Sequence, residues 1–134
     1  MTVADPTSKE EVFAHLKAIL QIFVPPLVVS KDDPENYYLD TVHTMRNKQP
    51  LFFGAVMIKK SYVSFHLMPV YACPALLENM SDALKARMQG KACFNFKKVE
   101  TALFEELTQL TRASFDRFQD RDMLEKFGVP LKRE

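Results

Sequence analysis

The sequence predicts an α+β domain with two layers, in which helices cover one face of a mostly antiparallel five-stranded sheet. Short runs that alternate apolar and polar residues, typical of strands, dominate residues 27–97. Short turn signals separate the first four runs, which favours antiparallel neighbours. Helical periodicity marks three other segments, near residues 8–23, 74–88 and 101–119. The expected order of elements is therefore α-β-β-β-β-α-β-α.

The first helix has a clear beginning and end. Ser8 followed by Glu11 forms a capping box, in which each side chain can satisfy a backbone donor of the first turn. Six apolar residues then share one helical stripe: Val12, Phe13, Leu16, Ile19, Leu20 and Phe23. Pro25 and Pro26 lack a backbone N–H, so the helix must stop before them.

Five strands are expected after this helix. Their ranges are Leu27–Lys31, Tyr37–Val42, Leu51–Ile58, Tyr62–Val70 and Lys91–Lys97. The third and fourth form the clearest hairpin, joined through Lys59, Lys60 and Ser61.

Two more helices complete the predicted domain. Pro74 suits the first turn of a helix between the fourth and fifth strands, and Gly90 suits its C-cap. A long helix is expected over Thr101–Gln119. We therefore expect a single α+β domain over residues 1–119 and a C-terminal tail over residues 120–134.

Composition places the chain among cytoplasmic globular proteins. Apolar residues make up 47% of the 134 residues, and there are only two cysteines, which we expect to be free thiols. No apolar run reaches the length of about 18 residues that suggests a membrane helix. The net charge is only +1, but residues 41–99 carry nine bases and two acids. This basic middle section suggests an anionic partner or ligand, although acidic helices packed around a basic sheet would explain the same asymmetry. A pI near 7.8 favours this second explanation and argues against a nucleic-acid partner.

Alternation assigns the side chains of the fourth and fifth strands to two faces. Val63, Phe65 and Leu67 must face the core, as must Ala92, Phe94 and Phe96. The opposite, uncovered face then carries the polar side chains. The candidate ligand-binding residues on that face are Tyr62, His66, Lys91, Cys93, Asn95 and Lys97.

Catalytic and metal-binding signatures are weak in this sequence. Cys93 and His66 share a face, so a Cys/His-dependent enzyme is conceivable, but no orienting carboxylate is placed beside them. Neither C-x-x-C nor H-E-x-x-H spacing occurs, so we expect no metal site. The chain has only three glycines, too few for a glycine-rich phosphate-binding loop, and we expect no cofactor.

The hairpin Leu51–Met68, with Lys60 before its second strand, and the strand that begins Gly90-Lys91 resemble the YdhG-like family of small bacterial domains. The likeness covers roughly residues 45–118. Gly90, Lys91 and Phe96 match the usual strand of the family, whereas Cys93, Asn95 and Lys97 depart from it. The resemblance implies a secretion-chaperone-like fold and no catalytic motif. It also implies a frataxin-like role in iron handling for Fe–S assembly, although a basic surface suits ferrous iron poorly.

These observations favour a non-enzymatic binding module. We expect the open sheet face to bind a small anionic ligand or a protein partner, with a homodimer through this face or an edge strand as one form of the latter. The alternatives are an iron-handling protein and, third, an enzyme that uses Cys93 and His66.

Overall fold

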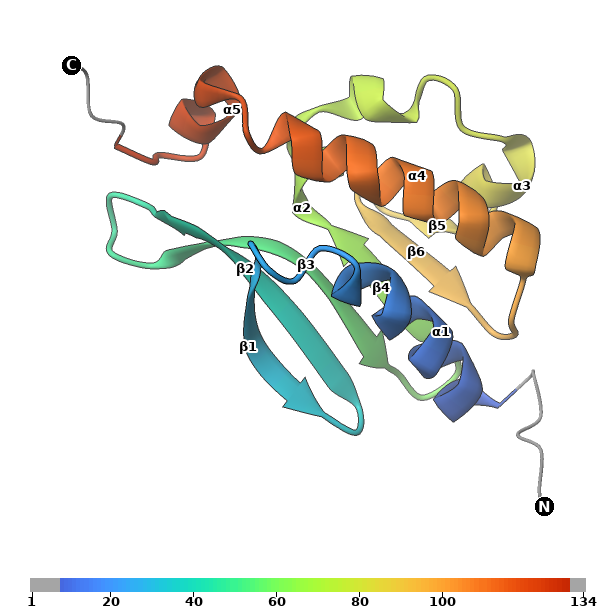
Figure 1. The fold of residues 1–134 in the computed structure, drawn as a ribbon. Coiled ribbons are helices and arrows are strands. Elements are labelled where there is room, and N and C mark those ends of the chain that lie inside the picture. The colour runs from blue at the N-terminus through green and yellow to red at the C-terminus, as the bar shows by residue number, and fades with distance from the viewer. Residues whose placement is uncertain (1–7, 131–134) are drawn as a thin grey trace.

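The computed structural model describes residues 8–130, which form one antiparallel sheet with helices on one face (Figure 1). The strands are β1 (Val28–Asp33), β2 (Asn36–Thr44), β3 (Pro50–Ile58), β4 (Val63–Leu67), β5 (Met88–Gln89) and β6 (Cys93–Phe96). Their order across the sheet is β1-β2-β3-β4-β6-β5, and every neighbouring pair is antiparallel. The predicted α+β class is confirmed.

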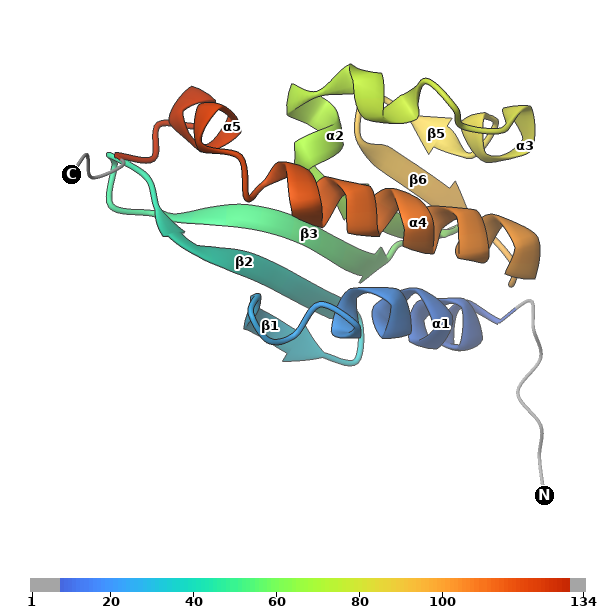
Figure 2. The ribbon, with the colours of Figure 1, turned by 45° about the horizontal axis from the view of Figure 1, so that its top comes forward.

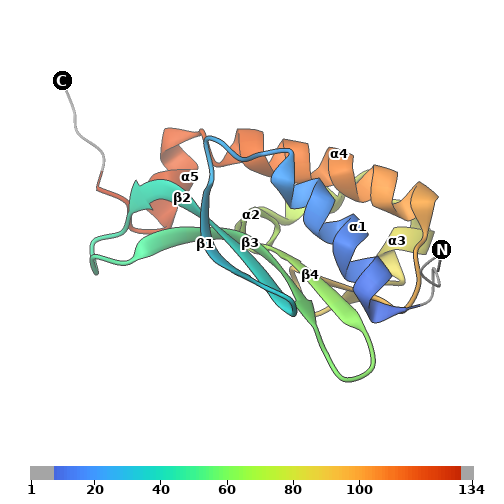
Figure 3. The same cartoon turned by 60° about the horizontal axis from the view of Figure 1, so that its bottom comes forward.

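Two long helices form the second layer. They are α1 (Lys9–Gln21) and α4 (Thr101–Arg117), and they lie side by side on the same side of the sheet (Figures 2 and 3). The side-chain oxygen of Ser8 accepts a hydrogen bond from the backbone N–H of Glu11 at 3.1 Å, as the capping box predicts. Glu11 itself does not reach back to Ser8 but contacts His15 at 3.2 Å.

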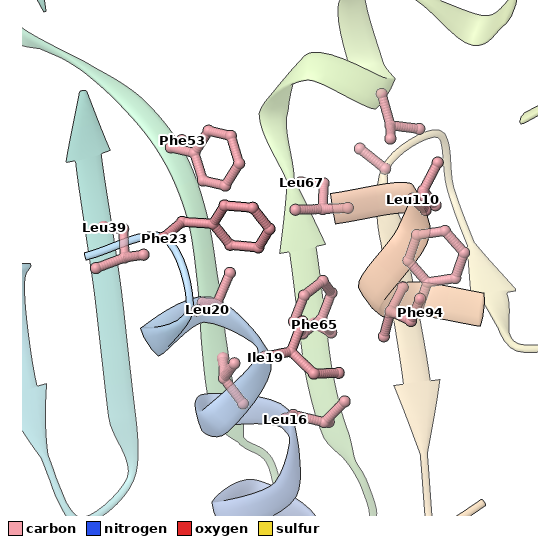
Figure 4. Close-up of a cluster of buried hydrophobic side chains, with 14 of the residues drawn as sticks. Leu16, Ile19, Leu20, Phe23, Leu39, Phe53, Phe65, Leu67, Phe94 and Leu110 are labelled. Atoms are coloured by element: carbon pink, nitrogen blue, oxygen red, sulfur yellow. The ribbon is translucent and has the colours of Figure 1, made fainter. Parts of the chain in front are cut away.

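The core lies between the helices and the sheet. Phe65 and Phe94 are opposite one another on β4 and β6 and are fully buried beneath the helices (Figure 4). Leu16 and Leu20 of α1 are buried in the same layer. The predicted core face of β4 is confirmed, because Val63, Phe65 and Leu67 all have no exposed surface. Burial of so many aromatic and aliphatic side chains provides the main stabilising term.

The region between β4 and β6 differs from the sequence prediction. The fourth strand ends at Leu67, because Met68–Ala72 form the short helix α2 with a proline in its first turn. The expected single helix from Pro74 is two short pieces, a 3-10 helix over Pro74–Leu77 and α3 over Asp82–Lys85. The apolar residues of segment 74–88 have helical spacing although they belong to separate segments, because all of these segments pack on the same core.

Gly90 is a turn residue rather than a helix C-cap. Met88–Gln89 pairs with Cys93–Phe96, so the sheet gains a sixth strand at its edge. Gly90 has a φ of 78°, a conformation that glycine adopts without a steric cost. The last strand accordingly begins at Cys93, and Lys91 lies in the turn before it.

The segment expected to be a tail contributes to the fold. Residues Arg121–Lys126 form α5, and Met123, Leu124 and Val129 are buried. The backbone N–H of Arg46 donates to the carbonyl of Gly128 at 2.8 Å and ties this segment to the β2–β3 turn. Residues 131–134 of the expected tail, like residues 1–7, lie outside the described part of the chain.

Candidate functional site on the open sheet face

Among the described residues, α1 and α4 cover one face of the sheet and leave the opposite face open (Figure 3). Strand pairing places sulfur-containing and polar side chains on this open face. Strand pairing places Ala55, His66 and Cys93 in one row across β3, β4 and β6. Met57, Ser64 and Asn95 form the next row. The expectation that His66, Cys93 and Asn95 share the uncovered face is thus met by the register.

The structure brings His66 and Cys93 into direct contact. The Nδ1 atom of His66 lies 2.8 Å from the Sγ atom of Cys93. Both side chains are half-buried, whereas Ser64 in the next row is only 5% exposed. The contact is possible because the two residues are directly opposite one another on antiparallel strands, where Cβ atoms approach to about 5 Å.

Burial determines the protonation of this pair. It lowers the pKa of His66 from its usual 6.5, and no charged neighbour counteracts that effect. Burial also raises the pKa of the Cys93 thiol, although a hydrogen bond with Ser64 and the charge of Lys59 act in the opposite direction. Both shifts favour the neutral thiol beside the neutral imidazole at pH 7.

Aromatic side chains continue the face away from Cys93. The ring of Phe52 lies 5.6 Å from the ring of His66 and 6.0 Å from that of Tyr38. The Tyr38 hydroxyl donates to the sulfur of Met57 at 3.0 Å, and Lys31 lies over the Tyr38 ring. On the open face of the sheet, these side chains therefore pack against one another.

A basic groove lies along β5 and β6, on the other side of the His66–Cys93 pair from these aromatic rings. Its volume is about 640 Å³. The groove is lined by Tyr62, Ala86, Arg87, Met88, Gln89, Asn95, Lys97, Lys98 and Glu100. Three predicted site residues, Tyr62, Asn95 and Lys97, contribute to this wall. Among the lining residues there are three bases and one acid, so the groove has a positive charge.

Two interactions fix the shape of the groove. Arg87 binds both carboxylate oxygens of Glu100, at 2.7 Å from Nε and 2.6 Å from Nη2. The hydrogen bonds to this guanidinium lower the pKa of Glu100 below its usual value. Between two other lining residues, the side-chain amide of Asn95 donates to Oε1 of Gln89 at 2.6 Å. Glu100 thus forms its ion pair with Arg87, and the charge of Lys98 also lowers the pKa of Glu100 without a salt bridge between the two.

Lys91 lies apart from the other predicted site residues. Its ammonium group is 5.7 Å from the ring centroid of Tyr71, and Lys97 is at the opposite end of β6. Sequence reasoning missed Arg87, Lys98 and Glu100 as parts of the site. The opposite charges of Arg87 and Glu100 were visible, but only the chain reversal at Gly90 explains how residues 13 positions apart meet.

Metal ligands do not gather on the described surface. Within residues 8–130, no group of three or more His, Cys, Asp or Glu side chains lies close enough together to hold a metal ion. Over the same residues, no helix combines the length and the hydropathy that crossing a membrane requires.

Comparisons with protein-family models, curated proteins and solved structures gave no match. The resemblance to the YdhG-like family therefore stays an expectation from the sequence. The thiol–imidazole contact and the basic groove are the features of the described residues that bear on function.

Proposed function

We propose that this protein is a binding module that takes a small anionic ligand into the basic groove along β5 and β6. The observation that carries this proposal is the combination of a groove of about 640 Å³ with an excess of bases in its wall. Ligand pockets commonly measure about 300–1,000 Å³, so the groove suits a small molecule.

The charges in the groove favour a ligand with more than one negative charge. Glu100 is already neutralised by Arg87, so its carboxylate does not repel an incoming anion strongly. Lys97 and Lys98 are exposed at the wall and can donate to phosphate or carboxylate oxygens. The Tyr62 ring and the Met88 side chain offer apolar surface to the rest of the ligand.

Iron handling has less support from the described residues. Iron handling would need a cluster of hard oxygen ligands, and the groove has a single carboxylate that is bound to an arginine. The homodimer and the protein partner expected from the sequence stay predictions. Size-exclusion chromatography with light scattering measures the first of them directly.

Titration calorimetry with pyrophosphate and phenyl phosphate tests the proposal. We expect both anions to bind the wild-type protein, and the double variant Lys97→Gln/Lys98→Gln to bind each at least about fivefold more weakly, as the loss of about 1 kcal/mol of charge interaction predicts. Lys91→Gln is the matched control because it removes a lysine from the far end of β6. Absence of binding, or an equal loss in the control, would refute the proposal.

A further inference from the structure

The contact between His66 and Cys93 has the geometry of a base and a nucleophile. A side chain that removes a proton must lie within about 2.6–3.2 Å of the atom that holds the proton. Nδ1 of His66 and Sγ of Cys93 are 2.8 Å apart. In the neutral pair the thiol donates to Nδ1, and the imidazole proton is then on Nε2.

The surroundings keep the pair neutral and accessible from one side. The closest residues on neighbouring strands are uncharged: Ala55 and Phe52 on β3, Ser64 on β4 and Gln89 on β5. Lys59, after β3, is the charged group that acts on the thiol, and it favours the thiolate. No helix covers the pair, because α1 and α4 lie on the opposite face (Figure 3).

The backbone around Cys93 restricts the reactions that this pair can promote. Addition to a carbonyl group requires hydrogen-bond donors for the oxyanion. β4 and β6 are each paired on both sides, so their N–H groups are engaged in the sheet; the N–H groups of Leu67 and Asn95, for example, bind the carbonyls of Ala92 and Arg87. Displacement at a sulfur atom develops no oxyanion and needs no such donors.

We propose that Cys93 and His66 form a nucleophile–base pair that exchanges with small disulfides. In this step His66 Nδ1 removes the thiol proton while Sγ attacks one sulfur of the disulfide. The new bond joins Cys93 to that sulfur, and the old S–S bond breaks. The leaving thiolate takes the proton from His66 and departs as a thiol, so atoms and electrons balance without another reactant.

The pH dependence of the reaction distinguishes this pair from an unassisted thiol. An unassisted thiol reacts through its thiolate, so its rate rises about tenfold per pH unit below its pKa. The neutral His66 imidazole is already hydrogen-bonded to the Cys93 thiol and can accept its proton during the attack. This route is equally available at every pH at which both groups are neutral. The pair is therefore expected to react at a nearly constant rate from pH 6.5 to 8.5.

The test uses the wild-type protein and the uncharged probe bis(2-hydroxyethyl) disulfide. Acid-quenched samples are digested, and mass spectrometry follows the adducts of Cys93 and Cys73 separately. Between pH 6.5 and 8.5 we expect the Cys93 rate to change less than about threefold, against a rise of about 50-fold for an unassisted thiol with an ordinary pKa of about 8.5. His66→Gln should restore the steep rise at Cys93, and the matched control His43→Gln on β2 should not.

A steep rise at Cys93 in the wild-type protein would overturn the proposal. So would the absence of a Cys93 adduct, or a flat profile that persists in His66→Gln. Circular dichroism establishes that the variants are folded, and the wild-type profile is decisive without them. The proposal does not depend on the anion groove, because the probe carries no charge.

Discussion

Replacing Gly54 by alanine tests how closely β3 and β4 approach each other at the site. A Cβ atom at this position would lie 2.8 Å from the carbonyl oxygen of His66, whereas ordinary contact begins at about 3.4 Å. The oxygen belongs to the backbone, so it cannot rotate away as a side chain could. The strands must instead separate by about 0.6 Å, the difference between these two distances.

The neighbours of Gly54 offer little room for this movement. The added atom would also lie 3.4 Å from Leu67 and 3.5 Å from Leu20, both of which are fully buried. Overpacking of this kind costs about 1–3 kcal/mol. With a urea dependence of about 1–3 kcal/mol per molar, the unfolding midpoint should fall by roughly 1 M.

Urea unfolding followed by circular dichroism measures the effect of Gly54→Ala. Ser61→Ala, in the exposed β3–β4 turn, is the control and should change the free energy of unfolding by less than about 0.5 kcal/mol. A Gly54→Ala variant as stable as the control would refute the reasoning, because it would mean that the two central strands separate without cost.

Three further predictions concern the core, the first helix and the pH dependence of stability. Phe65→Ala should lower the free energy of unfolding by about 3–5 kcal/mol, because the ring is fully buried; thermal unfolding that shows a loss below 1 kcal/mol would contradict its role. Ser8→Ala should cost about 1 kcal/mol through the lost cap of α1, and Ser8→Asp should retain most of the stability in the same urea assay. Burial holds the pKa of His66 below 6.5, so the unfolded chain binds the proton more readily; stability should be complete above pH 6.5 and should fall as the pH decreases below it. His66→Gln should reduce this acid-side slope, and an unchanged slope would assign the titration to other groups.

Local signals in the sequence predicted the long helices and the central strands correctly. Ser8 and Glu11 identify the beginning of α1, and Pro25 and Pro26 identify its limit. The apolar alternation of Val63, Phe65 and Leu67 correctly identifies the core face of β4. These signals suffice because each depends on residues within a few positions of one another.

The segment between β4 and β6 could not be predicted in the same way. Leu76, Leu77, Met80, Leu84 and Met88 have helical spacing, but they pack against the core from separate short segments and not from one helix. Ser81 begins a helix of its own, because its side chain accepts a hydrogen bond from the N–H of Leu84 at 3.1 Å. Tertiary packing thus overrides an apolar period that alone indicates one helix.

The candidate site was predictable as a face but not as a set of contacts. Alternation placed His66 and Cys93 on the same side, but their distance depends on the register between strands that 27 positions separate. The groove requires the β5–β6 reversal at Gly90, and the sequence prediction used that glycine to end a helix. The position of Arg87 and Glu100 follows from the same turn.

The packing of α5 has a consequence for synthesis of the chain. The Phe118 ring contacts Phe53 of β3 and Phe127, which follows α5, with ring centroids 6.1 and 5.3 Å apart. A ribosome that has released the chain only as far as α4 therefore presents one end of the sheet without its final cover. The Phe118 ring, which packs on Phe53, can be covered by Phe127 only after the α5 segment has emerged from the ribosome.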